Sequence, residues 1–299
     1  MIEEKLIKKF EKNITLNENL SKYSWFNLGG PAEIFFKPSD EIQIKEFLKE
    51  VKEHNKEIFI IGAGSNTLFR DKGLKGLAIK LGSNFSFIKK NGETEIEVGA
   101  ATLDKKVSNF TKENSITGFE FLSCIPGSIG GAIIMNSGCY GQEISQVLES
   151  LKIMDFNGDM KEISKADIEF YYRGTNLPKN VIILSAKFKG KKELNSKIEN
   201  LQNSFIQKKK KDQPSRVKTC GSTFKNPKGE KAWQLIRKTG SSKFVVGDAR
   251  ISEQHSNFFV NNGKAKASDI EELINKVKKN VLEKSGVTLS LEIKIIGDK

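Results

Sequence analysis

The segment formed by residues 123–132 constrains this chain more than any other part of its sequence. Three glycines and a proline lie within the seven residues from position 126 to position 132. Glycine adopts backbone angles that other residues avoid, and it lets the main chain approach a ligand closely. Consecutive backbone N–H groups in such a turn form a concave anion-binding nest. A structural turn packed against a sheet is the alternative explanation of the same residues.

Another glycine-rich loop, residues 62–66, lies upstream and directly follows the apolar run 58–61. In chain order, residues 62–66 are the first glycine loop and residues 123–132 are the second. Such a run indicates a buried strand. The loop is not a complete dinucleotide fingerprint, because the third glycine of the pattern would fall at Thr67. A tight turn after a strand remains the alternative, but two loops of this kind favour a dinucleotide diphosphate held from two sides.

The size and composition of the chain are those of a globular protein. Its 299 residues are enough to bury a sizeable core and to form two or three domains. No apolar run approaches the length that spans a bilayer, and residues 1–10 lack the apolar core of a signal peptide. We therefore expect a cytoplasmic protein that does not bind a membrane.

The three cysteines, Cys124, Cys139 and Cys220, are too few and too scattered to form a disulfide framework. They also lack metal-ligand spacing, and only two histidines accompany them, so we expect no metal site.

The formal net charge of +13 suggests anionic ligands, but lysines occur throughout the chain and usually form a solvated surface. The basic residues are not interleaved with aromatic residues, as a stacking groove for nucleic acid requires. Neither helix-turn-helix nor zinc-finger spacing is present. We expect no nucleic-acid partner, although a basic nucleotide- or RNA-binding protein without catalysis stays open as an alternative.

Hydrophobic periodicity predicts short strands mixed with few helices before residue 190, not a regular series of strand–helix–strand units. A short helix and a linker are expected in the first twenty residues, and Ser39 is expected to cap the next helix. The predicted strands cover residues 33–37, 58–61, 77–81, 95–98, 151–155 and 181–188. A short amphipathic helix is predicted around residues 103–110, and a longer one, with Leu194 on its apolar face, ends in residues 208–211.

The last third of the chain has a clear helix and a clear strand pattern. The helix is predicted to begin at Ser268, with Glu271 completing a capping box, and to end at Gly286. Strict alternation predicts a strand over residues 287–296. One face of that strand carries Val287, Leu289, Leu291, Ile293 and Ile295.

Four polar residues outside the glycine loops have both a functional and a structural interpretation. Arg173 could be an ordinary surface arginine, and Ser222 could belong to a loop that is merely polar. Glu292 faces away from the apolar side of its strand, which is the default for a solvated strand face. His255 precedes an apolar run, where a hydrogen-bonded structural histidine is common.

Taken in order, seven segments of the chain resemble the UDP-N-acetylenolpyruvoylglucosamine reductase family in its compact subtype. The resemblance spans residues 20–297, and the order and spacing of the motifs carry it. The segments are residues 29–32, 62–66, 125–132, 135–141, 172–173, 221–227 and 291–297.

This resemblance implies an α+β fold in which FAD lies between two α+β subdomains of the PCMH/vanillyl-alcohol-oxidase type. We expect these subdomains in residues 1–190, divided near residue 80. A C-terminal α/β substrate-binding domain is expected in residues 191–299, with Glu292 on its last strand. Related oxidases often tether the flavin through a histidine near the first loop. Since none is present there, we expect a non-covalent FAD.

The resemblance also assigns the cofactor-binding residues. From the first glycine loop they are Gly62, Ala63, Gly64, Ser65 and Asn66. From the second they are Ser123, Ile125, Pro126, Gly127, Gly130, Gly131 and Ala132.

The reaction that the resemblance implies reduces the enolpyruvyl ether of UDP-N-acetylglucosamine with NADPH, through FAD, in peptidoglycan precursor synthesis. Arg173 and Glu292 would stabilise the charge that develops next to the carboxylate, and Ser222 would donate the proton to C2. A Glu292 that helps an anion would have to be protonated or bonded through water, which predicts a raised pKa. Another FAD-dependent oxidoreductase of this fold, acting on a hydroxy acid or an alcohol, is the alternative.

Four further residues match substrate-contacting positions or are candidates for the UDP diphosphate. They are Asn226, His255, Tyr140 and Lys211, the last standing for the run of lysines at 208–211, any one of which could contact the diphosphate. We expect the partner to be this small sugar nucleotide and the enzyme to be a monomer.

Overall fold

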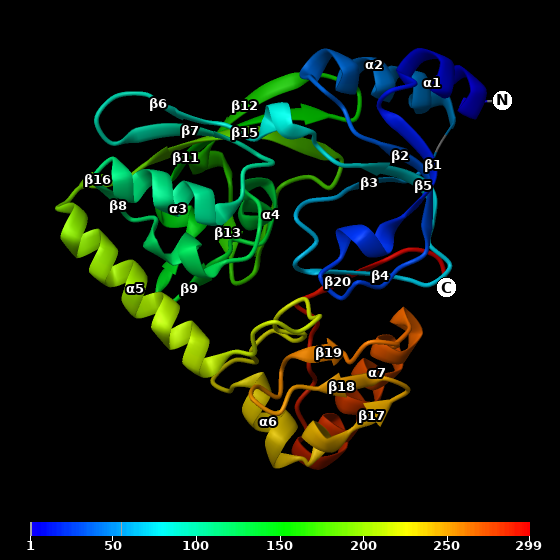
Figure 1. Cartoon of the computed structure of the whole chain (residues 1–299), viewed down its shortest axis with the longest axis vertical. Coiled ribbons are helices and arrows are strands. Elements are labelled where there is room, and N and C mark those ends of the chain that lie inside the picture. Colours follow the sequence, from blue (N-terminus) through cyan, green and yellow to red (C-terminus); the bar gives the residue numbers. More distant parts are fainter. Residues whose placement is uncertain (1, 55) are drawn as a thin grey trace. The chain divides into compact units, whose positions relative to one another are not determined.

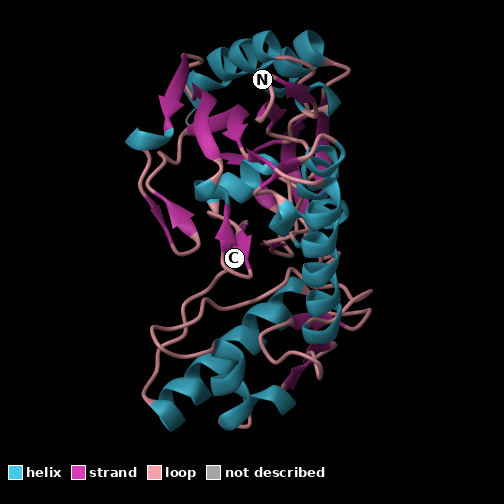
Figure 2. Cartoon of the chain, turned by 90° about the vertical axis from the view of Figure 1, so that its left-hand side faces the viewer, coloured by secondary structure: helices cyan, strands magenta, loops and turns pink. Residues whose placement is uncertain are grey.

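The computed structural model describes residues 2–54 and 56–299 (Figure 1). The structure contains both helices and strands (Figure 2), and their order along the chain is irregular. The helices are α1 (Ile2–Phe10), α2 (Glu41–Val51), α3 (Asp104–Glu113), α4 (Ile129–Ile134), α5 (Asn195–Asp212), α6 (Ala232–Lys238) and α7 (Ala267–Ser285).

The chain forms two compact units that are interleaved in sequence. The first unit contains the described residues up to Thr15, together with residues 34–63 and 76–209. The second contains residues 16–33, 64–75 and 210–299. The domain boundary near residue 190 that the sequence predicts stays a prediction.

A five-stranded antiparallel sheet is the centre of the first unit, in the order β12-β11-β15-β7-β6. Its middle strand is almost wholly buried, and helices α3 and α4 contribute to the same apolar core. The strands are β6 (Ile88–Lys90), β7 (Glu95–Gly99), β11 (Leu148–Asp155), β12 (Met160–Ser164) and β15 (Val181–Lys189).

Three short strand pairs complete the part of the first unit around this sheet. They are β8 (Ile116–Thr117) with β16 (Lys191–Lys192), β9 (Gly138–Cys139) with β10 (Gln142–Glu143), and β13 (Phe170–Tyr171) with β14 (Gly174–Thr175).

A four-stranded sheet has the order β1-β2-β5-β3, and its strands β1, β2 and β5 carry residues of both units. The strands are β1 (Ile14–Asn19), β2 (Pro31–Phe36), β3 (Ile58–Ile60) and β5 (Leu74–Ile79). In the first unit Phe47 of α2 stacks on Phe36 of β2 with ring centroids 4.0 Å apart, and Phe10 of α1 packs edge-on against both.

The second unit has its own apolar core, built around α6 and α7. Its strands are β4 (Thr67–Phe69), which pairs in parallel with β20 (Lys294–Ile296), and the antiparallel set β17 (Val245–Val246), β18 (Ala249–Ile251) and β19 (Phe259–Asn261). The apolar face predicted for α7 is confirmed, since its five members are all buried: Ile270, Leu273, Ile274, Val277 and Val281. The predicted end of this helix is confirmed too, because Gly286 adopts the left-handed conformation with φ +71°.

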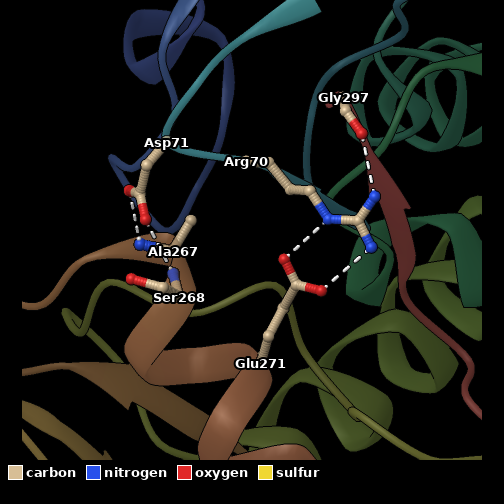
Figure 3. A network of polar contacts seen from close by, with 6 residues as sticks. All are labelled: Arg70, Asp71, Ala267, Ser268, Glu271 and Gly297. Atoms are coloured by element: carbon tan, nitrogen blue, oxygen red, sulfur yellow. Dashed lines mark hydrogen bonds and ion pairs between the residues drawn. The ribbon is translucent and has the colours of Figure 1, made fainter. Parts of the chain in front are cut away.

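Both predicted helix caps are wrong. Helix α2 is capped by Asp40, whose side chain accepts the Gln43 N–H, and not by Ser39. Helix α7 begins at Ala267 and its capping box uses Asp269. Glu271 instead forms a bidentate ion pair with Arg70 (Figure 3).

Three further expectations about the elements need correction. The linker expected after the first helix contains β1. In the predicted last strand, residues 294–296 form β20 and Leu291 makes only an isolated β-bridge with Phe224, although the alternation holds and the apolar face packs on the core of the second unit. Leu194, expected on the apolar face of a helix, is 64% exposed and precedes α5.

The Phe36–Phe47 stack predicts a stability difference between two positions on α2. Replacing Phe47, which is fully buried, by alanine should lower the free energy of unfolding by about 3–5 kcal/mol, through lost burial and a cavity. The control Ile42→Ala removes a side chain that is 71% exposed and should cost about 0.5 kcal/mol or less. Urea denaturation followed by circular dichroism measures both, and equal losses would contradict the packing described.

Candidate active site

The first glycine loop contains a position that only glycine can occupy without strain. Gly64 has φ +71°, and a Cβ atom there would overlap the carbonyl oxygen of Tyr23. The Trp25 N–H donates to the Gly64 carbonyl at 3.1 Å, which holds the two segments together. The requirement for glycine therefore comes from a close approach of two backbones.

The two glycine loops approach each other within the first unit. A Cβ atom on Gly62 would lie 3.2 Å from Oγ of Ser128, and one on Gly131 would lie 3.9 Å from the same oxygen. Ser128 precedes α4, but its hydroxyl makes no capping hydrogen bond to that helix. This proximity is what binding of one diphosphate by both loops would require. The sequence-based residue set omitted Ser128, although it stands between two of the glycines.

Lys80 brings a positive charge to the first loop. Its ammonium donates to the carbonyl oxygen of Gly62 at 2.6 Å. Burial lowers the pKa of Lys80, and the nearby Lys37 lowers it further. The sequence could not single out this residue, because lysines are common throughout the chain.

A buried carboxyl lies behind the second loop. Asp104, at the start of α3, is fully buried, and neither of its carboxyl oxygens has a hydrogen-bond partner among the described residues. A Cβ atom added to Gly127 would lie 2.5 Å from Oδ2 of Asp104. Burial raises the pKa of Asp104 well above its usual range, which favours the neutral acid. A neutral acid at this place does not repel an anion held by the loop.

The remaining second-loop residues of the predicted set lie in or beside the turn that leads into α4. Ser123, Ile125 and Pro126 are half-buried, while Ala132 is buried. The Ala132 N–H donates to the carbonyl of Ser128 at 2.8 Å, which starts the helix.

In the second unit, the end of the first glycine loop is bonded to the segment that carries Glu292. The side-chain amide of Asn66 donates to the Glu292 carbonyl at 3.1 Å. The Lys294 N–H donates back to the Asn66 carbonyl at 2.9 Å, just before β4 and β20 pair. Two residues 226 positions apart in sequence are thus neighbours.

The segment that carries Ser222 lies beside Glu292 as well. The Glu292 N–H donates to the carbonyl of Thr223 at 2.8 Å, and Ser222 forms an isolated bridge with Phe258. The side chain of Asn257 fixes this segment by donating to the Phe224 carbonyl at 2.8 Å and accepting the Phe224 N–H at 2.9 Å. The structure therefore places Asn66, Ser222 and Glu292 on adjacent segments of one unit.

The other predicted substrate contacts of the second unit have structural partners. Gln254, next to His255, donates to the carbonyl of Lys211 at 3.1 Å. The Asn257 N–H donates to Nδ1 of His255 at 3.3 Å. Asn226 accepts the Ala232 N–H at the start of α6.

Arg173 and Tyr140 belong to the first unit, and both have a positive φ, of 59° and 55°. The Arg173 guanidinium donates to the Gly138 carbonyl at 3.0 Å. The ring of Tyr140 packs on Phe205, with centroids 5.1 Å apart, and Lys208 lies 4.8 Å from the Tyr140 ring centroid. Since Arg173 lies in one unit and Ser222 and Glu292 in the other, their joint action stays a prediction.

In residues 2–54 and 56–299, no group of three or more histidine, cysteine, aspartate or glutamate side chains is placed so that it could hold a metal ion. Within these same residues, no helix combines the length and the apolar character needed to cross a membrane.

Two models of known protein families match different parts of the chain. Residues 32–164 match the model of an FAD binding domain. Residues 213–296 match the model of the C-terminal domain of UDP-N-acetylenolpyruvoylglucosamine reductase.

Curated relatives extend this match over nearly the whole chain. A UDP-N-acetylenolpyruvoylglucosamine reductase of Rickettsia bellii (strain RML369-C) is 45% identical over 279 residues, which is 93% of this chain and 92% of the relative. One of Pelagibacter ubique (strain HTCC1062) is 44% identical over 297 residues, which is 97% of this chain and 98% of the relative. The solved UDP-N-acetylenolpyruvylglucosamine reductase (MurB) of Thermus caldophilus superposes with a TM-score of 0.81 at 30% identity, covering 94% of this chain and 97% of that one.

An FAD-binding domain followed by this C-terminal domain defines an FAD-containing oxidoreductase, so the predicted fold class and cofactor are confirmed. The chain belongs to the UDP-N-acetylenolpyruvoylglucosamine reductase family. The approach of the two glycine loops to each other at Ser128 fits the binding of one FAD diphosphate by both.

The overlap at Gly64 predicts that Gly64→Ala weakens FAD binding at least about tenfold, or about 1.4 kcal/mol. The control is Gly92→Ala, where φ is also positive (+107°) but a Cβ atom would meet nothing within 4 Å. Flavin fluorescence titration measures both affinities, with circular dichroism to verify folding. An equal effect of the two substitutions would show that backbone strain alone matters at Gly64.

His255 predicts a pH-dependent stability. Burial lowers its pKa below the usual 6.5, so in the window between the two values the unfolded chain holds a proton that the folded chain does not. The contribution of His255 to the free energy of unfolding should therefore rise with pH across this window, and His255→Gln should make the slope less positive than in the wild type. Urea denaturation of the wild type and the variant at several pH values measures the difference between the two slopes. The control His54→Gln, at an exposed position, should keep the wild-type slope, and equal slopes in the wild type and His255→Gln would contradict the assignment.

Proposed function

We propose that this chain reduces UDP-N-acetylglucosamine enolpyruvate to UDP-N-acetylmuramate with NADPH, in the synthesis of peptidoglycan precursors. The observation that carries the proposal is family membership over both the FAD-binding and the C-terminal parts. The alternative substrates, a hydroxy acid or an alcohol, are not favoured, because the C-terminal match is to a reductase of this family.

When bound, FAD would supply the hydride chemistry between NADPH and C3 of the enolpyruvyl group. The two glycine loops would hold its diphosphate, and Lys80 brings a positive charge to the first loop. We propose residues 1–190 as the FAD-binding region and residues 191–299 as the substrate domain.

Arg173 and Glu292 act on the carboxylate of the enolpyruvyl group. The Arg173 guanidinium is oriented by the Gly138 carbonyl and carries the positive charge that the developing enolate needs. The backbone of Glu292 is fixed from two sides, by Asn66 and by Thr223, so its position does not depend on side-chain contacts alone.

Ser222 is the proton donor to C2. A serine hydroxyl is a weak acid, so it serves only if it is held in line with a strongly basic carbon. Two sets of contacts hold this segment rigid. Ser222 forms an isolated β-bridge with Phe258, and the Asn257 side chain is hydrogen-bonded to the N–H and the carbonyl of Phe224.

The nucleotide part of the substrate binds to Lys211, His255, Asn226 and Tyr140. The carbonyl of Lys211 is bonded to Gln254, which holds this lysine next to His255. Lysine is a point charge rather than a bidentate fork, so it attracts a diphosphate without fixing its orientation. The enzyme is proposed to act as a monomer in the cytoplasm, without a nucleic-acid or membrane partner.

The direct test mixes the purified protein with NADPH and the enolpyruvyl sugar nucleotide and follows the loss of NADPH. We expect consumption that depends on the sugar nucleotide and yields UDP-N-acetylmuramate. Consumption of NADPH that is independent of this substrate, with no such product, would contradict the proposal.

Ser222→Ala separates the two half-reactions. NADPH should still bleach the flavin, while turnover of the enolpyruvyl substrate falls by about 10²–10⁴-fold because the proton donor is lost. Stopped-flow absorbance measures both steps. The control Ser290→Ala changes an exposed serine of the same unit and should alter neither. If flavin reduction itself is lost in Ser222→Ala, the role given to this serine is wrong.

A further inference from the structure

Two cysteines lie close together in the first unit, one in the second glycine loop and one in a strand beside it. Cys124 ends the short helix η4 (Glu120–Cys124), and Cys139 ends β9. The Cys139 thiol donates to the carbonyl of Phe121 in η4 at 3.5 Å, and Cys124 lies three residues further along the same short helix, so the two cysteines are neighbours. Both are free cysteines.

Polar groups around Cys124 favour its thiolate. The ammonium of Lys209 donates to the Cys124 carbonyl at 2.7 Å, and Oγ of Ser123 lies 3.7 Å from Sγ of Cys124. The neighbouring Cys139 thiol, with smaller contributions from Ser123 and Lys209, lowers the pKa of Cys124 to about 6 against the effect of burial. The neighbouring Cys124 and burial raise the pKa of Cys139.

Cys220 provides an internal contrast. It is buried in the second unit, and its thiol donates to the carbonyls of Thr67 and Gly64, at 3.3 and 3.5 Å. Burial raises the pKa of Cys220 to about 11. A thiol of this kind is inert, because the thiolate is the reactive form.

We propose that Cys124 and Cys139 form a dithiol–disulfide pair that hydroperoxides oxidise. The Cys124 thiolate attacks one peroxide oxygen, the O–O bond breaks, hydroxide leaves, and Cys124 becomes a sulfenic acid. The sulfur of Cys139 then displaces the sulfenic oxygen, which leaves as water with the proton of Cys139. In sum, two thiols and one hydrogen peroxide give one disulfide and two waters.

The position of the pair connects it to the proposed active site. Cys124 lies at the start of the second glycine loop, and Cys139 follows Gly138, whose carbonyl accepts the hydrogen bond of Arg173. A disulfide would tie these two segments covalently. A thiol modification at this place can therefore alter how the loop and the arginine are held.

The test oxidises the FAD-loaded protein with hydrogen peroxide, denatures it in acid, alkylates the remaining thiols and maps the peptides by mass spectrometry. We expect a peptide that links Cys124 to Cys139, lighter than its two parts by two hydrogen atoms and split by dithiothreitol. Cys220 should be recovered fully alkylated.

Two cysteine variants show which thiol takes part in each step of the oxidation. Cys220→Ser should keep the crosslink, whereas Cys139→Ser should abolish it and leave a Cys124 sulfenic acid that dimedone traps. The proposal is overturned if wild-type Cys124 and Cys139 both stay alkylatable, or if Cys124 is oxidised further without a link to Cys139. The peptide readout does not depend on turnover, so it stands or falls separately from the proposed reaction.

Discussion

The parallel pairing of β4 with β20 is the constraint on which the proposed site depends. Its register aligns residues 67–69 with residues 294–296, so a segment near the start of the chain lies against its last strand. Arg70 extends the connection by donating to the Gly297 carbonyl, and Asp71 accepts the N–H groups of Ala267 and Ser268 at the start of α7 (Figure 3). The end of the first glycine loop and the segment of Glu292 are therefore fixed together in the second unit.

Much of the secondary structure is predictable because local periodicity decides it. The apolar face of α7, its end at Gly286 and the buried strand β15 all follow from residue spacing, and the structure confirms them. The helix caps are less predictable, because Ser39 and Asp40 are adjacent and both residue types cap helices. Glu271 has the spacing of a capping box, but its carboxylate forms an ion pair with Arg70, 201 positions away, instead of capping the helix.

The motifs of the candidate site can be recognised in the sequence, but the long-range contacts that position them cannot. The glycine loops were found because glycine and proline are locally conspicuous. Lys80 and Asp104 were missed because an ordinary lysine and an ordinary aspartate gain significance only through burial and distant neighbours. The spacing of residues could not predict that Asn66 lies next to Glu292 either, because no local sequence pattern indicates a contact between residues 226 positions apart.

The enclosed Asp104 has a consequence for the folding reaction itself. Burial in the folded chain raises the pKa of this side chain well above its value in the unfolded chain. In the pH range between the two values, folding is therefore coupled to the uptake of a hydrogen ion from the solvent, and a rising pH works against it. Asparagine would fill almost the same space with no ionisable group, so packing alone does not demand an acid behind this loop.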